Sequence, residues 1–124
     1  MEKYLFLLIT IVVTATSQIA LKMTIGQLMP QLPEMNSFTN LLKAAFIVFK
    51  NWQILLILLF SALGFFSWFL TLTKFELSHA FPLMAVVYIL VLLASWLIFK
   101  ENISSLRIAG SLLIALGVFL VAKS

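Results

Sequence analysis

The sequence predicts an all-α membrane protein with four transmembrane helices, because its composition, its length and the placement of its charges all favour that fold. Of the 124 residues, 64% are hydrophobic and 10% are charged, and the mean hydropathy is +1.19. A soluble domain is only about half apolar and about a quarter charged. Because a transmembrane helix needs roughly 20 apolar residues, residues 1–124 can hold four of them as a single transmembrane domain.

The first apolar run predicts a transmembrane helix at about residues 4–22. Its first part, followed by small residues, also fits a signal peptide. The apolar pattern continues through Leu21, however, so we expect a retained helix. Gly26, Pro30 and Pro33 predict a loop that begins at Met23.

The remaining chain predicts three more transmembrane helices, at about residues 52–73, 78–99 and 105–121. Residues 38–50 have apolar side chains at helical spacing but are too few to span, so they predict an interfacial helix or an extension of the next helix. Short connections make successive helices antiparallel neighbours. Pro82, one turn into the third transmembrane helix, predicts a helix bend.

The basic residues lie mainly at helix ends, which explains the net charge of +4 without a nucleic-acid partner. Four spans put both termini on one side of the membrane. The excess of Lys and Arg lies on the other side, so the loops after the first and third transmembrane helices are expected to be cytoplasmic. The residues on that side are Lys22, Lys43, Lys50, Lys100 and Arg107, against Lys3, Lys74 and Lys123 on the side of the termini.

Polar residues recur every three or four positions along the first helix and form what we call the polar stripe: Thr10, Thr14, Ser17, Gln18 and Lys22. The hydroxyl groups could return hydrogen bonds to backbone carbonyls of the preceding turn. Gln18 needs partners that its own helix cannot supply, so it is expected to face a polar cavity or another helix. Lys22 could extend to the lipid headgroups or take part in a binding site.

A charged layer is expected where the first and third transmembrane helices end and the fourth begins, and it consists of Lys22, Lys100, Glu101 and Arg107. Glu101 could pair with Lys22 or with Arg107. The remaining positive charge would suit an anionic headgroup such as a phosphate.

Small residues mark two helix faces. In the second transmembrane helix, Ser61 and Gly64 predict close packing against a neighbour, and Trp68 could line a substrate path or anchor the helix at the interface. In the fourth, small residues at spacings of four and seven predict a close helix contact. We favour a contact across a dimer, because four helices enclose little volume. These residues are Gly110, Ser111, Ala115 and Gly117.

Several chemistries are not expected. The chain has no Cys and a single His, which argues against disulfides, thiolate catalysis and transition-metal sites. We therefore predict no enzyme active site, no cofactor and no metal. None of Glu2, Glu34, Glu76 and Glu101 lies mid-span, whereas a proton-coupled exporter of cations needs a carboxylate inside the membrane.

Three segments together resemble the drug/metabolite transporter superfamily, in its short four-helix, EamA-like branch. The first is Ser17-Gln18-Ile19-Ala20-Leu21-Lys22, and the second is His79-Ala80-Phe81-Pro82-Leu83-Met84. The third, Phe99-Lys100-Glu101-Asn102-Ile103-Ser104, precedes a helix with Ala109-Gly110 and Gly117-Val118. The order and spacing of these segments carry the resemblance, which covers almost the whole chain.

Within that superfamily the chain is more similar to the paired subunits that flip 4-amino-4-deoxy-L-arabinose on undecaprenyl phosphate than to the small multidrug resistance exporters. Those exporters carry a Glu eight residues before a Lys in the first helix, where this chain has Thr14. The resemblance implies flipping of a lipid-linked monosaccharide across the bacterial inner membrane, for modification of an envelope glycan or lipid A. It also implies a homodimer, or a heterodimer with a related small subunit, in contact with membrane lipids.

The resemblance suggests how the cargo would be held. Lys22 and Gln18, with Lys100, Glu101 and Arg107 nearby, would hold the phosphate and the sugar, and Trp68 and Phe81 would stack on the ring. Thr14 belongs to the same expected site. Two alternatives stay open: a proton-coupled exporter of small cations or metabolites that depends on Glu76 or Glu101, and a non-transporting subunit of a membrane complex. The sugar and the energy source stay open as well.

Overall fold

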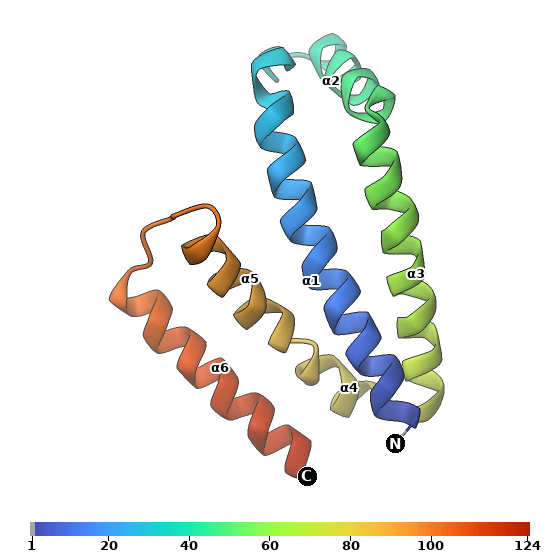
Figure 1. The fold of residues 1–124 in the computed structure, drawn as a ribbon, viewed down its shortest axis with the longest axis vertical. Coiled ribbons are helices and arrows are strands. Elements are labelled where there is room, and N and C mark those ends of the chain that lie inside the picture. Colours follow the sequence, from blue (N-terminus) through green and yellow to red (C-terminus); the bar gives the residue numbers. More distant parts are fainter. Residues whose placement is uncertain (1) are drawn as a thin grey trace.

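The computed structural model describes residues 2–124, which form helices and connecting segments without any strand (Figure 1). Four of its segments are long and apolar enough to cross a membrane, which confirms the predicted all-α fold with four spans. The spans are Tyr4–Gln31, Trp52–Lys74, Leu77–Leu97 and Ser105–Lys123. The helices are α1 (Glu2–Leu28), α2 (Phe38–Lys50), α3 (Trp52–Lys74), α4 (Leu77–Leu83), α5 (Val86–Leu97) and α6 (Ser105–Lys123), with a short 3-10 turn, η1 (Met29–Gln31).

Helix α1 is longer than the sequence predicts, because it ends at Leu28 and not near residue 22. The prediction of a loop that begins at Met23 was wrong. Gly26 does not end the helix, since one glycine costs only about 1 kcal/mol relative to alanine. Thr24 and Leu28 are buried and hold this last part of α1 against the rest of the molecule. The helix stops where Pro30, which has no N–H to donate, enters the 3-10 turn.

Helix α2 is a separate element and not the start of α3. Its N-cap is Ser37, whose hydroxyl accepts a hydrogen bond from the N–H of Asn40 at 3.2 Å. Asn51 has an extended backbone and caps α3, accepting from the N–H groups of Gln53 and Ile54 at 2.8 and 3.2 Å. Figure 1 shows α2 beside the end of the molecule where α1 finishes and α3 begins. Its position in the membrane interface stays a prediction.

The third span is interrupted two residues beyond Pro82, the residue at which the sequence predicts a bend. The helix breaks at Met84 and Ala85, between α4 and α5. Through the break the hydrogen bonds tighten to three-residue spacing: the N–H of Ala85 donates to Pro82 at 3.0 Å and that of Tyr88 donates to Ala85 at 3.0 Å. Figure 1 shows the chain changing direction there.

The packing centres on α1, which lies along α3 and also contacts α5, while α6 packs on α4 and α5. Gly64 allows the close approach of α3 to α1, because a Cβ built there would lie 2.8 Å from Cγ1 of Val13. The expected packing role of Gly64 is therefore present within the monomer.

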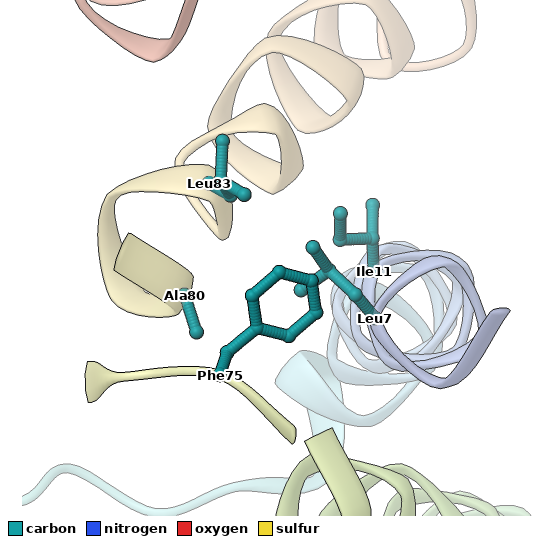
Figure 2. Close-up of a cluster of buried hydrophobic side chains, with 5 residues drawn as sticks. All are labelled: Leu7, Ile11, Phe75, Ala80 and Leu83. Carbon is teal, nitrogen blue, oxygen red and sulfur yellow. The ribbon is translucent and has the colours of Figure 1, made fainter. Parts of the chain in front are cut away.

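A small apolar core joins α1 to the connection between α3 and α4. It contains Leu7, Ile11, Phe75, Ala80 and Leu83. Figure 2 shows the Phe75 ring projecting toward Leu7 and Ile11, with Ala80 and Leu83 on the α4 side. The ring also meets Tyr4 edge-on, with centroids 5.2 Å apart, and stacks on His79 at 5.4 Å. This core holds the start of α4 close to α1.

Candidate functional site

A cavity of about 360 Å³ lies between α1, α3 and the junction of α4 with α5. Its size is within the ordinary range of small-molecule sites, about 300–1,000 Å³. Exposed side chains at its edge leave it open to its surroundings. We call it the α1–α3 cavity, and its lining consists of Thr10, Val13, Thr14, Ser17, Gln18, Ser61, Gly64, Phe65, Trp68, Phe81 and Met84.

The polar stripe of α1 supplies most of the polar atoms of this cavity. Four of its five members line the cavity, because residues three and four apart share one face of a helix. The Thr10 hydroxyl donates a hydrogen bond to the Phe6 carbonyl at 2.8 Å. Within residues 4–124, the side chains of the other stripe members make no hydrogen bond. The hydroxyl of Thr14 and the amide of Gln18 are therefore available to a ligand.

Ser17 is the most unusual of these groups. Its side chain is only 6% exposed, and its hydroxyl oxygen has no hydrogen-bond partner within the described part of the chain. A buried polar group without a partner is costly, so such a group needs an explanation. The sequence placed Ser17 in the polar stripe but did not single it out as a binding residue. Its position three residues after Thr14 was the available signal.

Trp68 and Phe81 form the aromatic part of the cavity. Their rings lie edge to face, with centroids 6.2 Å apart and planes at 67°. Phe81 lies in α4 just before Pro82, is 65% exposed and borders the cavity. Thr14, Gln18, Trp68 and Phe81, which the sequence analysis selected from three separate helices, thus line one cavity.

The charged layer lies outside the cavity. Lys22 is exposed and follows Gln18 by four residues, which is about 6 Å along the helix axis. Lys100 and Arg107 are exposed too, and Glu101 lines a different cavity. The expected pairing of Glu101 with Lys22 or Arg107 is not present, because residues 4–124 show no ion pair involving these side chains.

A second cavity, of about 590 Å³, lies between α5 and α6. It is mostly apolar, with Glu101 and Asn102 among its lining residues. Ser111 and Ala115 also line it, so these two small residues face α5 within the monomer. A Cβ built at Gly110 or Gly117 would meet nothing within 4 Å, so the glycines leave a free surface on α6.

The turn between α5 and α6, which carries Lys100 and Glu101 of the charged layer, has an uncommon backbone. Lys100 has a φ of 53°, a left-handed conformation that glycine normally occupies at helix ends. Beyond it, the Ser104 hydroxyl caps α6 by accepting from the N–H of Arg107 at 3.2 Å. The positive φ could not be predicted from the sequence, because lysine rarely adopts it.

In chemical terms, the α1–α3 cavity offers neutral hydrogen-bonding groups and aromatic faces. Within residues 4–124, no acidic or basic side chain lines it. Such a surface suits a polar ring, whose hydroxyls can bond to Thr14 and Gln18 while its apolar face meets Trp68.

Comparison with known proteins identifies relatives over almost the full chain. The EamA-like transporter family matches residues 2–123. The probable 4-amino-4-deoxy-L-arabinose-phosphoundecaprenol flippase subunit ArnE of Pseudomonas aeruginosa (strain UCBPP-PA14) is 33% identical over 118 residues, covering 95% of each chain. The corresponding subunit of Pseudomonas paraeruginosa is 31% identical over 94% of each chain. The probable ArnF subunit of Serratia proteamaculans is 39% identical over 48% of each chain. No solved structure matches this chain.

Proposed function

Because this chain belongs to the EamA-like transporter family, we propose that it flips a monosaccharide linked to undecaprenyl phosphate from one leaflet of the bacterial inner membrane to the other. The cargo class comes from the relatives, which are named as flippase subunits for such a lipid. We infer that the transported sugar serves modification of an envelope glycan or lipid A.

The α1–α3 cavity carries this proposal. A flippase has to shelter only the polar head of its lipid, because the polyprenyl tail can stay in the bilayer. An open cavity of about 360 Å³, bordered by exposed Gln18 and Phe81, meets that requirement. Buried hydroxyls and aromatic rings inside the span would replace part of the water that the sugar leaves behind.

Lys22 is the best candidate to hold the phosphate. It lies on the same face of α1 as Gln18, one helical turn beyond the cavity. A phosphate bonded to a sugar inside the cavity would then be within reach of the lysine ammonium group. Lys100 and Arg107 belong to the same layer and would add positive charge at the lipid headgroups.

We further propose that the working unit is a dimer, either of two copies or with a related small subunit. The relatives are named as subunits of a flippase, and matches to both ArnE and ArnF occur. A partner would supply walls on the side where the cavity is open. The free surface of α6 at Gly110 and Gly117 is the face we expect it to use.

Transport in reconstituted vesicles tests the proposal. The protein, with any subunit that co-purifies, is placed in liposomes with undecaprenyl phosphate-linked arabinose. The sugar that reaches the outer leaflet is oxidised by membrane-impermeant periodate. Lys22→Ala is expected to slow flipping roughly tenfold, because a charge-assisted hydrogen bond is lost.

Lys74→Ala is the matched control, since Lys74 is exposed at the far end of α3 and outside the charged layer. Its flipping rate should match that of the unaltered protein. Flipping no faster than in empty liposomes would refute the proposed function. Equal effects of the two substitutions would instead remove Lys22 from the phosphate site.

A further inference from the structure

The cavity of about 590 Å³ between α5 and α6, which we call the α5–α6 cavity, is separate from the α1–α3 cavity, because the two share no lining residue. Its side walls come from α5 between Ile89 and Trp96 and from α6 between Ile108 and Ala115. Each of these stretches covers about two helical turns, which rise about 10 Å. The cavity therefore extends from the turn that joins the two helices well into both spans.

The polar groups of the α5–α6 cavity lie mainly at one end. Glu101 and Asn102 belong to the turn that joins α5 to α6 (Figure 1), where the two spans meet the membrane boundary. Deeper in the cavity the Ser111 hydroxyl already donates a hydrogen bond, to the Arg107 carbonyl at 2.7 Å. Apart from Trp96, the other helical residues of the lining are leucine, isoleucine and alanine. This distribution suits an amphiphile, with its polar head at the turn and a hydrocarbon chain between the helices.

The charges at the turn indicate the kind of head. Glu101 is exposed, and its carboxylate makes no hydrogen bond or ion pair within residues 4–124. A carboxylate at the lipid headgroups attracts an ammonium group and repels an anionic one. Lys100 and Arg107 lie on either side of Glu101 in the sequence, are also exposed and add positive charge to the same layer. A headgroup that carries both an ammonium and a phosphate complements both signs of charge.

We propose that the α5–α6 cavity holds one phosphatidylethanolamine molecule of the surrounding leaflet. Its ammonium group binds Glu101, its phosphate lies beside Lys100 and Arg107, and one acyl chain lies between α5 and α6. Phosphatidylglycerol offers the same chain but has no amine for Glu101, so the site prefers the ethanolamine lipid. This lipid site is distinct from the sugar site and does not depend on the identity of the cargo.

Quenching of tryptophan fluorescence measures which lipid occupies the cavity. Trp96 lines the cavity, and replacing Trp52 and Trp68 by Phe leaves it as the one tryptophan of the chain. This protein is placed in phosphatidylcholine bilayers with increasing fractions of phosphatidylethanolamine or phosphatidylglycerol whose acyl chains carry bromine, a contact quencher. The quenching curves should show that phosphatidylethanolamine binds roughly three- to fivefold more strongly than phosphatidylglycerol, as one partly exposed ion pair allows.

Three matched proteins show where the preference arises. Glu101→Gln removes the charge, keeps the shape of the side chain and should abolish the preference at Trp96. Glu76→Gln alters an exposed carboxylate before α4, at the other end of the third span, and should retain it. A protein with Trp52 as its one tryptophan reports on exposed lipid at the start of α3, and it should show no preference for the ethanolamine lipid.

Ala115→Phe tests the place of the acyl chain. Phenylalanine at this position fills the inner part of the cavity, so brominated phosphatidylethanolamine should bind less strongly and quench Trp96 less at a low lipid fraction. Leu116→Phe is the control, because Leu116 is exposed, follows Ala115 directly and does not line the cavity. Its quenching curve should match that of the protein with Leu116.

Stronger binding of phosphatidylethanolamine at Trp96 that is lost in Glu101→Gln and kept in Glu76→Gln supports the proposal. Equal quenching by the two lipids overturns it, and so does a preference that survives Glu101→Gln. If a second copy of the chain covers the cavity, neither lipid quenches Trp96 efficiently, which also overturns the proposal. None of these outcomes alters the proposed flippase function, because the α1–α3 cavity takes no part in them.

Discussion

At the scale of single residues, Gly64 determines how closely α1 and α3 can pack. A methyl group there would come within 2.8 Å of the Val13 side chain. Val13 is itself buried and branched at Cβ, so it has little freedom to move away. The polar groups of α1 and the aromatic residues of α3 can border one cavity only while this close contact is kept.

Gly64→Ala is therefore expected to destabilise the protein by about 1–3 kcal/mol, the usual cost of adding a methyl group to a packed site. Thermal unfolding in detergent micelles, followed by tryptophan fluorescence, measures the change. Gly26→Ala is the control, because a Cβ at Gly26 meets nothing within 4 Å and alanine favours the helix. An unchanged melting temperature for Gly64→Ala would show that the two helices do not pack this closely.

The sequence predicted part of the candidate site at this scale. Helical spacing was enough to identify Thr14, Gln18 and Trp68, because residues on one face of a helix stay together whatever their neighbours. It could not show that Lys22 and Glu101 lie outside the cavity, since position along the chain gives the depth of a residue in the membrane but not the direction of its side chain. The unpartnered hydroxyl of Ser17 depends on what surrounds it, and only the structure describes those surroundings.

At the scale of elements, the interruption of the third span matters most. The four spans followed from apolar length, whereas the helix break at Met84 and Ala85 lies two residues beyond the predicted position, Pro82. The end of α1 did not follow from the sequence, because Gly26 is a weak breaker and burial of Leu28 outweighs it. The separation of α2 from α3 depended on Asn51, whose capping role shows only in its hydrogen bonds.

Pro82→Ala should join α4 and α5 into one helix, because alanine restores the missing donor and removes the clash with the preceding turn. Hydrogen exchange at residues 84–88 should then become slower. Flipping should also slow, since Phe81 and Met84 would leave their places in the α1–α3 cavity. Pro33→Ala, in the connection before α2, serves as the control and should change neither quantity.

Unchanged exchange at residues 84–88 in Pro82→Ala would mean that the break has another cause. The three-residue hydrogen bonds around Met84 would then persist without the proline. Slower exchange with unchanged flipping would show that the bend shapes the helix but does not position Phe81 for transport.

At the scale of the whole molecule, the four spans are unevenly covered. Only 6% of the apolar window of α6 is buried within the molecule, compared with 33% for the first span. In a membrane an exposed apolar face is not by itself unstable, because lipid tails are as apolar as leucine. The two glycines on this face are more informative, since small residues let a second helix approach closely, and a Cβ built at either one meets nothing within 4 Å.

Gly117→Leu tests whether this face joins two subunits. The chain has no Cys, so a Ser124→Cys background provides one labelling site for donor and acceptor dyes in liposomes. Leucine at residue 117 should weaken dimers roughly tenfold by keeping the backbones apart, and energy transfer should fall. The monomer should fold normally, because a side chain there meets nothing within 4 Å at its Cβ. Ala122→Leu is the control, because residue 122 lies about 140° around the helix from Gly117, and energy transfer should be retained in that variant. If Gly117→Leu retains energy transfer to the same extent, the dimer contact lies on another helix.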